Sequence, residues 1–580
     1  MQARASKLNN ALRAAVNRFP GWLSVLGVLV ACLLLVPVVS IAASVFAPDA
    51  GAWTHIRQTL LAELVQNSLW LALAVGIGVG VIGTLGAWLT ANHDFPGRSA
   101  FEWLLILPLA MPAYVMAYTY TDILQYAGPV QSALREWFGW QSKGDYWFPE
   151  IRSLGGAAVM LTFVLYPYVY VLARVAFLEQ SPTLSEAGRT FGYGRVGIFW
   201  RISLPLARPA IAAGVALALM ETLADYGTVA YFGVPTFTTG IFNAWFSQGD
   251  RVSASKLAAI LMAFVIVMLA MEHAARRRAR FYQGSRRLRR TQLAGSRALI
   301  ATALCVLPLA IGFIVPVLIL LKLAIVDGDP TFGARFFKLA ANSFGIALVT
   351  AAIAVAIALL LAYSARAAQS RWSAFINRLV ALGYAIPGTV IAVGVLLPMA
   401  TLDHWLVNAL QKITGIALPL LLTGGVLALV YAYLIRFLGI ALQSVDAGLA
   451  KITPRMDDAA RSLGATQAGV AIRVHAPLLR SSLITAGLLV FVDVMKELPA
   501  TLVLRPFNFD TLAVQAYNLA MDERLAEAST ASLAIVAVGI IPVIMASRAI
   551  TRTTAHNTTL PPARLAAMDA PGGPNAINPA

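Results

Sequence analysis

Along almost its whole length, the chain alternates long apolar runs with short polar loops. A helix needs about 20 apolar residues to cross the hydrocarbon core of a membrane, and about twelve runs reach that length. These runs lie near 22–46, 64–91, 101–124, 154–178, 208–233, 256–272, 297–325, 341–364, 373–400, 416–442, 480–504 and 528–549. The pattern therefore predicts an all-α polytopic membrane protein with about twelve transmembrane helices.

Composition and charge add an orientation to this prediction. Of the 580 residues, 59% are hydrophobic and only 12% are charged, which is too little charge to cover a water-soluble surface of this size. Lys and Arg in short loops stay in the cytoplasm, and most of the 44 basic residues fall there if the N-terminus is cytoplasmic. We expect a multi-pass protein of the bacterial inner (plasma) membrane with both termini in the cytoplasm.

The eight arginines from Arg276 to Arg290 lie between the sixth and seventh runs, where this orientation requires a cytoplasmic loop. Such a cluster could also bind nucleic acid or anionic lipid. We interpret it as a topological anchor and linker, and we expect no nucleic-acid partner.

One polar loop occurs twice. Glu186, Gly192 and Pro205 recur 272 positions later as Asp458, Gly464 and Pro477. Lipid requires apolar spans of any sequence but requires nothing of a loop in water, so a repeated loop indicates that something outside the membrane binds it. The duplication extends into the spans at a shift of 275, where Asn67-Ser68 matches Asn342-Ser343 and Pro112 matches Pro387.

Because each half carries an even number of spans, the copies enter the membrane in the same direction, as parallel six-helix repeats with a path between them. We expect five segments: a cytoplasmic tail at 1–21, a first half at 22–272, a basic cytoplasmic linker at 273–296, a second half at 297–549 and a disordered cytoplasmic tail at 550–580.

Each repeated loop contains the signals of a short helix. Ser181-Pro182 and Thr453-Pro454 give a hydroxyl N-cap followed by Pro at the first helical position. Gly192 and Gly464 suit the left-handed residue that ends a helix. Between them, Glu186-Ala187-Gly188 and Asp458-Ala459-Ala460 combine an acid with two small residues, which predicts close approach by a partner's surface. The alternative is an inert amphipathic scaffold at the lipid surface.

The pattern Glu-Ala-Gly-x3-Gly-x9-Ile-x-Leu-Pro resembles the EAA loop of ABC importer permeases, which docks into a groove on a cytoplasmic ATPase. The second copy departs from the pattern with Asp458 for Glu, Val474 for Ile and Ala476 for Leu. The resemblance implies a type I permease-like fold and these docking residues: Glu186, Ala187, Gly188, Gly192, Ile202, Leu204, Pro205, Asp458, Ala459, Ala460, Gly464, Val474 and Pro477.

No Gly-Lys dipeptide occurs in the chain, so a phosphate-binding loop of the G-x4-G-K-[ST] type is absent from its sequence. ATP would then be hydrolysed by a separate ABC ATPase, which two docking loops would bind as two copies. We expect a non-catalytic membrane subunit with no cofactor of its own, since no partnered His or Cys nucleophile accompanies the acids.

Substrate is predicted from two aligned segments, Glu221–Pro235 and Asp493–Thr511. They resemble the ferric-iron branch of these permeases, which works with a periplasmic ferric-binding protein. Glu221 and Asp225 are four residues apart, as are Asp493 and Glu497, so each pair would share one helical face. Intramembrane acids often line a pathway, and carboxylate oxygens suit a hard cation, without forming a tight metal site. The competing interpretation pairs these acids with Lys496, Arg174 or Arg436.

Three other functions stay open at this point. A permease for thiamine or another small solute would share the fused two-half plan. An ion-coupled secondary transporter would share the span count and parallel repeat, but would leave the duplicated loop without a purpose. A membrane scaffold or receptor would dock cytoplasmic proteins and transport nothing.

Overall fold

The computed structural model describes residues 21–48, 52–277, 290–330, 332–368, 371–416 and 419–556. Within these ranges, 11 helices are long and apolar enough to cross a membrane. A twelfth crossing results if the bent pair Arg98–Ala110 and Ala113–Phe138, which meet at 90°, is taken as one span. The predicted all-α polytopic fold is confirmed.

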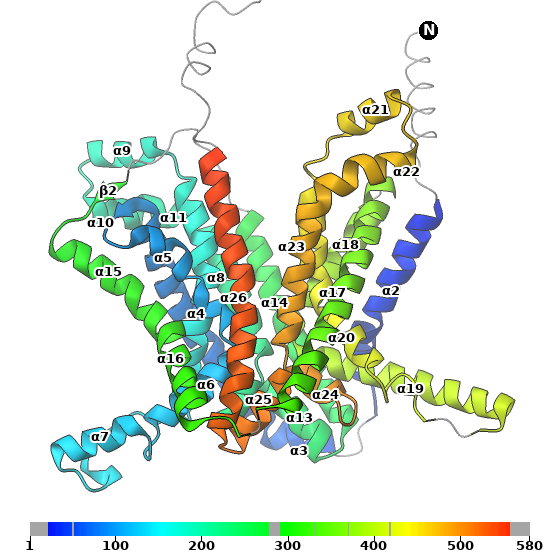
Figure 1. The fold of residues 1–580 in the computed structure, drawn as a ribbon, viewed down its shortest axis with the longest axis horizontal. Coiled ribbons are helices and arrows are strands. Elements are labelled where there is room, and N and C mark those ends of the chain that lie inside the picture. Colours follow the sequence, from blue (N-terminus) through cyan, green and yellow to red (C-terminus); the bar gives the residue numbers. More distant parts are fainter. Residues whose placement is uncertain are drawn as a thin grey trace, which may run out of the picture.

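The helices and the two short strands follow one another in this order (Figure 1): α2 Gly21–Ser44, α3 Ala52–Thr59, α4 Leu61–Asn92, β1 His93–Asp94, α5 Arg98–Leu104, α6 Ala113–Leu124, α7 Pro129–Phe138, α8 Leu154–Leu178, α9 Pro182–Thr190, α10 Arg195–Ile198, α11 Leu204–Ala224, α12 Gly227–Tyr231, α13 Phe237–Phe242, α14 Arg251–Arg277, β2 Thr291–Gln292, α15 Ser296–Leu309, α16 Val315–Lys322, α17 Ala334–Ala368, α18 Arg371–Ala381, α19 Gly388–Thr414, α20 Leu427–Leu449, α21 Pro454–Ser462, α22 Gln467–Val470, α23 Ala476–Met495, α24 Pro499–Leu504, α25 Leu512–Met521 and α26 Leu525–His556. Short 3-10 turns lie at Leu107–Ala110, Lys143–Asp145 and Leu382–Ala385. Wider π turns lie at Phe199–Ser203, Asn243–Ser247, Ala310–Ile314, Leu323–Asp327 and Ala471–His475.

The first span of each half packs against the opposite half. Helix α2 lies against α17, α18 and α19, whereas the α15–α16 span lies against α4, α5, α6 and the turns between them. Helix α14 likewise contacts α19, and α26 contacts the turn before α6. The largest cluster of buried apolar side chains therefore contains residues of both halves. The halves of the sequence are interlocked in space.

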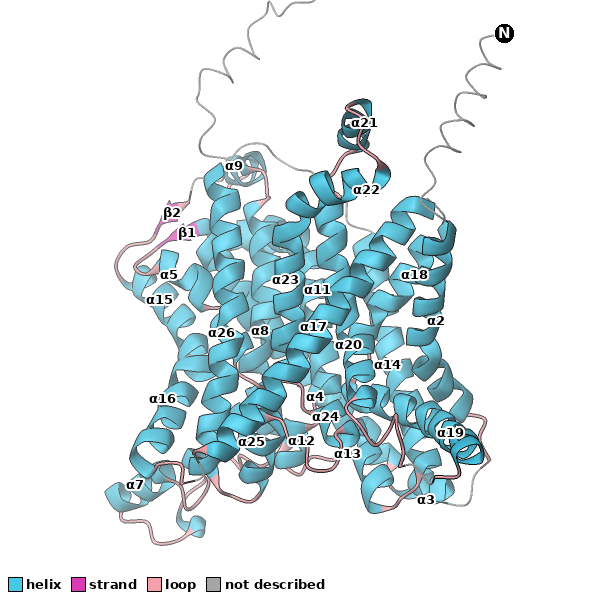
Figure 2. Ribbon diagram, turned by 45° about the vertical axis from the view of Figure 1, so that its right-hand side comes forward, coloured by secondary structure: helices cyan, strands magenta, loops and turns pink. Residues whose placement is uncertain are grey.

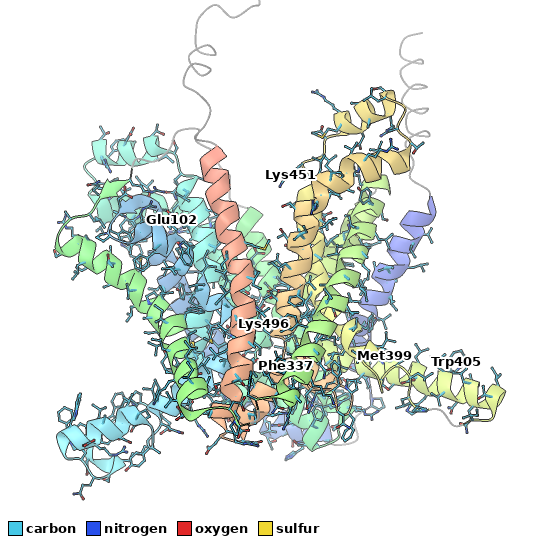
Figure 3. All side chains as sticks on the ribbon, viewed as in Figure 1. Glu102, Phe337, Met399, Trp405, Lys451 and Lys496 are labelled. Atoms are coloured by element: carbon cyan, nitrogen blue, oxygen red, sulfur yellow. The ribbon has the colours of Figure 1, made fainter. Side chains whose placement is uncertain are left out.

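The third span of each half, predicted at 101–124 and 373–400, is broken at the aligned prolines that it contains. Pro112 and Pro387 have extended backbone angles, with ψ near 139° and 142°, and each stands directly before a new helix. A proline has no N–H to continue the preceding helix, which accounts for the break. Helix α7 and the distal part of α19 then extend sideways from the bundle at the same end (Figure 1), and Trp405 lies on this outward part (Figure 3).

The fifth spans are also shorter than predicted. The apolar runs at 208–233 and 480–504 contain a break, because α11 ends at Ala224 and α23 ends at Met495. Two short helices follow in each half, α12 and α13 in the first, α24 and α25 in the second. Glycine, proline and acidic residues at these points disfavour helix continuation, a signal that hydropathy alone does not register.

The aligned Asn-Ser pairs hold these returning segments in place. Asn67 donates a hydrogen bond to the carbonyl of Pro235 at 3.0 Å, and Asn342 donates to that of Asp510 at 3.1 Å. The next serine in each half, Ser68 or Ser343, accepts from a backbone N–H at the start of α13 or α25. The four bonds obey the same shift of 275, so the structural repeat extends to individual hydrogen bonds.

Both repeated loops lie at the same end of the bundle. Helices α9 and α21 stand near the first described turn of α2 and the last turn of α26, opposite to α3, α7, α13 and α25 (Figures 1 and 2). At this end, β1 and β2 form one short parallel pair, His93 with Thr291 and Asp94 with Gln292. The strand pair attaches the end of the linker to the first half.

Several predicted segment boundaries shift. Helix α20 begins at Leu427 rather than near 416, and α26 continues to His556, so residues 550–556 of the predicted disordered tail are helical. Most of the predicted N-terminal tail, residues 278–289 of the linker and residues 557–580 lie outside the described residues.

Candidate functional site

The two repeated loops form matching helices. Helix α9 runs from Pro182 to Thr190 and α21 from Pro454 to Ser462, each with proline at its start. Ser181 and Thr453 occupy the predicted N-cap positions, but neither side chain makes a capping hydrogen bond. The Ser181 hydroxyl instead lies 2.7 Å from that of Thr183. The prediction of where each helix begins is correct, whereas the predicted hydroxyl cap is wrong.

Both helices end in the same way at the predicted glycines. Gly192 has φ of 80° and Gly464 has φ of 83°, in the left-handed region that favours glycine. After each glycine, one backbone N–H returns to the helix: Tyr193 donates to Gly188 at 3.0 Å, and Ala465 donates to Ala460 at 3.1 Å. These bonds satisfy carbonyls that the end of a helix would otherwise leave unpaired.

Most of the acidic and small residues of the two repeated loops are exposed. Exposed positions in both copies are Glu186, Ala187, Gly192, Asp458, Ala459 and Gly464. Ala460 is half-buried. The acids and small side chains thus lie on a surface that a second protein can reach.

Gly188 is an exception, and the expectation that it leaves room for a partner is wrong. The residue is buried, and a methyl group added there would come within 2.6 Å of the Ile202 side chain and 3.3 Å of Ile198. Its small size allows α9 to pack closely on the chain that follows. In the second copy this position is Ala460, which is half-buried, so the two helices differ in how closely this position packs against the rest of the protein.

The residues that follow each glycine connect the helix to a membrane span. Ile202 lies in a π turn, and Leu204 and Pro205 begin α11. Val474 lies in the matching π turn, and Pro477 lies in the first turn of α23. In each half, one π turn therefore separates the loop helix region from the span that follows, α11 or α23.

The four predicted pathway carboxylates line one cavity between the halves, of about 130 Å³. Glu221 and Asp225 come from the end of α11, and Asp493 and Glu497 come from the end of α23. Lys496, which lines the same cavity, lies near the centre of the fold between the two groups of helices (Figure 3). The remaining wall is mostly apolar, with Tyr114, Tyr168 and Tyr384 among its side chains.

The expectation that each acid pair shares one helical face is wrong, because both helices end between the two acids. Asp225 accepts hydrogen bonds from the backbone N–H groups of Thr228 and Val229, at 3.0 and 3.2 Å. Glu497 accepts from those of Ala500 and Thr501, at 2.9 and 3.1 Å. Each of these acids therefore caps the short helix that follows, α12 or α24.

The other acids are paired with cations, as the competing interpretation predicted in part. Arg436 lies 3.9 Å from Glu221 and 3.4 Å from Glu497, and Lys496 lies 3.0 Å from Asp493. Arg174, the third cation in that interpretation, instead pairs with Glu102 at 3.1 Å. The acids thus line the cavity and also form ion pairs there.

The two halves contribute unequal charge to the cavity. Both supply two carboxylates, but the cations come from the second half alone. Counting back 272 positions from Arg436 and Lys496 gives Val164 and Ala224, which also line the cavity. If the four carboxylates and the two cations are all charged, the negative charges outnumber the positive ones by two.

Sequence reasoning missed the tyrosines of this cavity. Tyr384 donates a hydrogen bond of 2.8 Å to Glu221. The buried hydroxyl of Tyr114 has no hydrogen-bond partner among the described residues. Tyr114 and Tyr384 lie within three residues of the aligned Pro112 and Pro387, so a search around these prolines would have found them.

Within the described residues, no group of three or more His, Cys, Asp or Glu side chains is arranged to hold a metal ion. The cavity carboxylates already accept hydrogen bonds or pair with cations, as described above.

Residues 76–280 match a protein family described as the inner membrane component of binding-protein-dependent transport systems. Over 541 residues, the chain is 25% identical to an Fe(3+)-transport system permease protein of Haemophilus influenzae, covering 91% of this chain and 98% of that one. It is 24% identical to a ferric transport system permease protein of Actinobacillus pleuropneumoniae, covering 85% of this chain and 73% of that one. A sulfate transport system permease protein of Escherichia coli is 28% identical over 260 residues, 43% of this chain and 90% of that one.

Proposed function

Because the chain belongs to the family of inner membrane components of binding-protein-dependent transport systems, the ABC importer permeases, we propose that its substrate is ferric iron. A periplasmic binding protein of the ferric-binding type would deliver the iron to the end of the bundle that carries α3, α7, α13 and α25. Two copies of a separate ATPase would bind at the opposite, cytoplasmic end, where α9 and α21 stand.

The duplicated docking helix is the observation that carries the coupling part of the proposal. Two exposed copies, α9 and α21, lie at one end of the fold and lead into the two spans, α11 and α23, whose ends line the cavity. Closure of an ATPase pair would draw the copies together and alternate the cavity between the two sides of the membrane. The chain itself hydrolyses no ATP in this scheme and holds no cofactor.

Two observations support iron as the substrate: how much of the chain each relative matches, and the charge of the cavity. The two ferric relatives match both halves of the chain, whereas the sulfate relative matches under half of it. Four carboxylates against two cations leave the cavity acidic, which favours a cation in transit. Both termini would lie in the cytoplasm, on the side where the basic residues predominate.

An oxyanion is the second candidate substrate, for two reasons. Sulfate permease is among the relatives, and Arg436 and Lys496 both line the cavity. Uptake into proteoliposomes that contain the permease, two ATPase copies and a ferric-binding protein decides between them. Radioactive iron should accumulate only with ATP and all three components. ATP-dependent accumulation of sulfate or molybdate with the corresponding binding protein, and none of iron, would overturn the iron proposal.

A further inference from the structure

Asp457 connects the second docking helix to the membrane spans. It lies in the first turn of α21, and its two carboxylate oxygens have different partners. One oxygen lies 2.7 Å from Nε2 of His475, and the other lies 2.9 Å from the guanidinium of Arg366. Because a carboxylate only accepts, both partners donate to it. The carboxylate is thus held from two sides.

Arg366 extends this connection to two spans. The residue belongs to the last turns of α17, and it also donates to the carbonyls of Leu449 and Ile452 at 3.3 and 3.2 Å. Leu449 is the last residue of α20, where a positive charge is favourable, and Ile452 lies in the turn between α20 and α21. One guanidinium therefore fixes α21 relative to both α17 and α20.

His475 adds a further link. Its ring is only 2% exposed, in the turn that leads into α23. Since Nε2 donates to Asp457, Nδ1 is left to accept, and the hydroxyl of Tyr363 in α17 lies 2.8 Å from it. Together, Asp457, Arg366, His475 and Tyr363 form what we call the α21 clamp.

The first half cannot form this clamp. Counting back 272 positions from Asp457 and His475 gives Ser185 and Ser203, and counting back 275 from Tyr363 and Arg366 gives Trp88 and Ala91. None of these four residues is ionisable. At this place the first half has aromatic packing instead, with the Trp88 ring 4.8 Å from that of Phe199 and 4.5 Å from that of His93.

We propose that the two docking helices are coupled unequally to the membrane spans: the α21 clamp makes α21 move as one unit with α17, α20 and α23, whereas α9 moves with more freedom. The four clamp residues act as positioning residues for the second ATPase site. This inference rests on the proposed coupling function. It assigns the stiffer connection to the docking loop that departs from the family pattern at Asp458, Val474 and Ala476.

The test exchanges clamp residues for their first-half counterparts, as Asp457→Ser and His475→Ser. Backbone amide exchange is followed in α21 and in α9 of the full chain in lipid nanodiscs, with and without the ATPase subunits. Loss of a hydrogen bond to a charged group should raise the exchange rate in α21 by about tenfold and leave α9 unchanged. Helix α9 is thus an internal control for folding.

A coupling measurement separates positioning from a purely structural role. The number of ATP molecules hydrolysed per solute imported should rise in both variants, and Asp457→Glu, which retains the charge, should restore it in part. Arg455→Ser, which removes an exposed charge from the same helix, serves as the matched control and should leave exchange in α21 unchanged.

Two results would overturn the inference: unchanged exchange in α21 of both serine variants, or an equal increase in α9. Failure of the proposed function would give a different result, because the unaltered chain would then bind no ATPase subunit. In that case the comparison of exchange rates without the subunit still decides whether the α21 clamp holds α21 in place.

Discussion

The carboxylate of Glu221 in α11 lies 3.9 Å from the guanidinium of Arg436 in α20, so an ion pair joins the two halves of the chain inside the cavity. Tyr384, also from the second half, donates to the same carboxylate. Any movement that separates α11 from α20 breaks these contacts and exposes their charges to the cavity. Of the four acids of this site, Asp225 and Glu497 cap short helices, and Glu497 also pairs with Arg436. Glu221 and Asp493 contact cations without capping a helix.

Glu221 and Asp493 are the pair that contacts cations without capping a helix. Replacing them together, as Glu221→Gln and Asp493→Asn, should lower solute uptake by about tenfold or more, since the cavity loses its excess negative charge. Binding of the ATPase subunit should not change. Uptake in proteoliposomes and co-purification of the subunit measure the two effects, and uptake at the unaltered rate would exclude a role of these acids in the path.

Asp225 and Glu497 are the pair that caps α12 and α24. Asp225→Ala should cost about 0.5–2 kcal/mol of stability, because the backbone N–H groups of α12 lose their acceptor. Glu497→Ala should cost more, because it also removes the carboxylate that pairs with the buried Arg436. Thermal unfolding in detergent measures this cost. Glu150→Ala, which removes an exposed acid, is the control. Equal melting temperatures for Asp225→Ala and the control would show that the cap contributes nothing.

Gly192 and Gly464 end the docking helices with positive φ, and nothing lies within 4 Å of a methyl group added at either one. Gly192→Val with Gly464→Val should therefore act through backbone strain alone, about 1–3 kcal/mol at each site. We expect the affinity for the ATPase subunit to fall by about tenfold or more, as measured by titration in nanodiscs. Gly194→Val, in equally open space but without positive φ, should retain the affinity. Unchanged affinity and uptake in the double variant would refute the docking role.

Gly83 lets α4 approach α8 closely. A methyl group there would lie 2.6 Å from Cβ of Val169 and 2.8 Å from the carbonyl oxygen of Tyr166. Gly83→Ala should cost about 1–3 kcal/mol through overpacking. Gly80→Ala, one turn earlier in the same helix, meets only Val215 at 3.7 Å and should be neutral or stabilising. Melting temperatures of the two variants check the difference, and similar values would contradict the packing argument.

Much of the architecture could be predicted from the sequence, because a lipid bilayer restricts which sequences can span it. A span must be apolar for about 20 residues, so hydropathy located the spans. Proline and glycine punctuation located α9 and α21 to within a residue of their ends, since caps depend on local backbone chemistry. The breaks after Ala224 and Met495 were missed, because apolar residues continue through them and hydropathy does not distinguish a helix from a returning segment.

The sequence by itself determined the approximate number of spans, the repeat and the positions of α9 and α21, since hydropathy, recurring residues and helix caps can all be read directly from the chain. Only the tertiary structure decided that Gly188 packs inward and that α2 and the α15–α16 span each pack on the opposite half. It also decided that Asp225 and Glu497 cap helices, and that Glu221, Asp493 and Glu497 pair with cations. Some of these outcomes depend on contacts between residues far apart in the chain, such as Glu221 and Arg436, and others depend on where a helix ends. Apolar periodicity records neither of these.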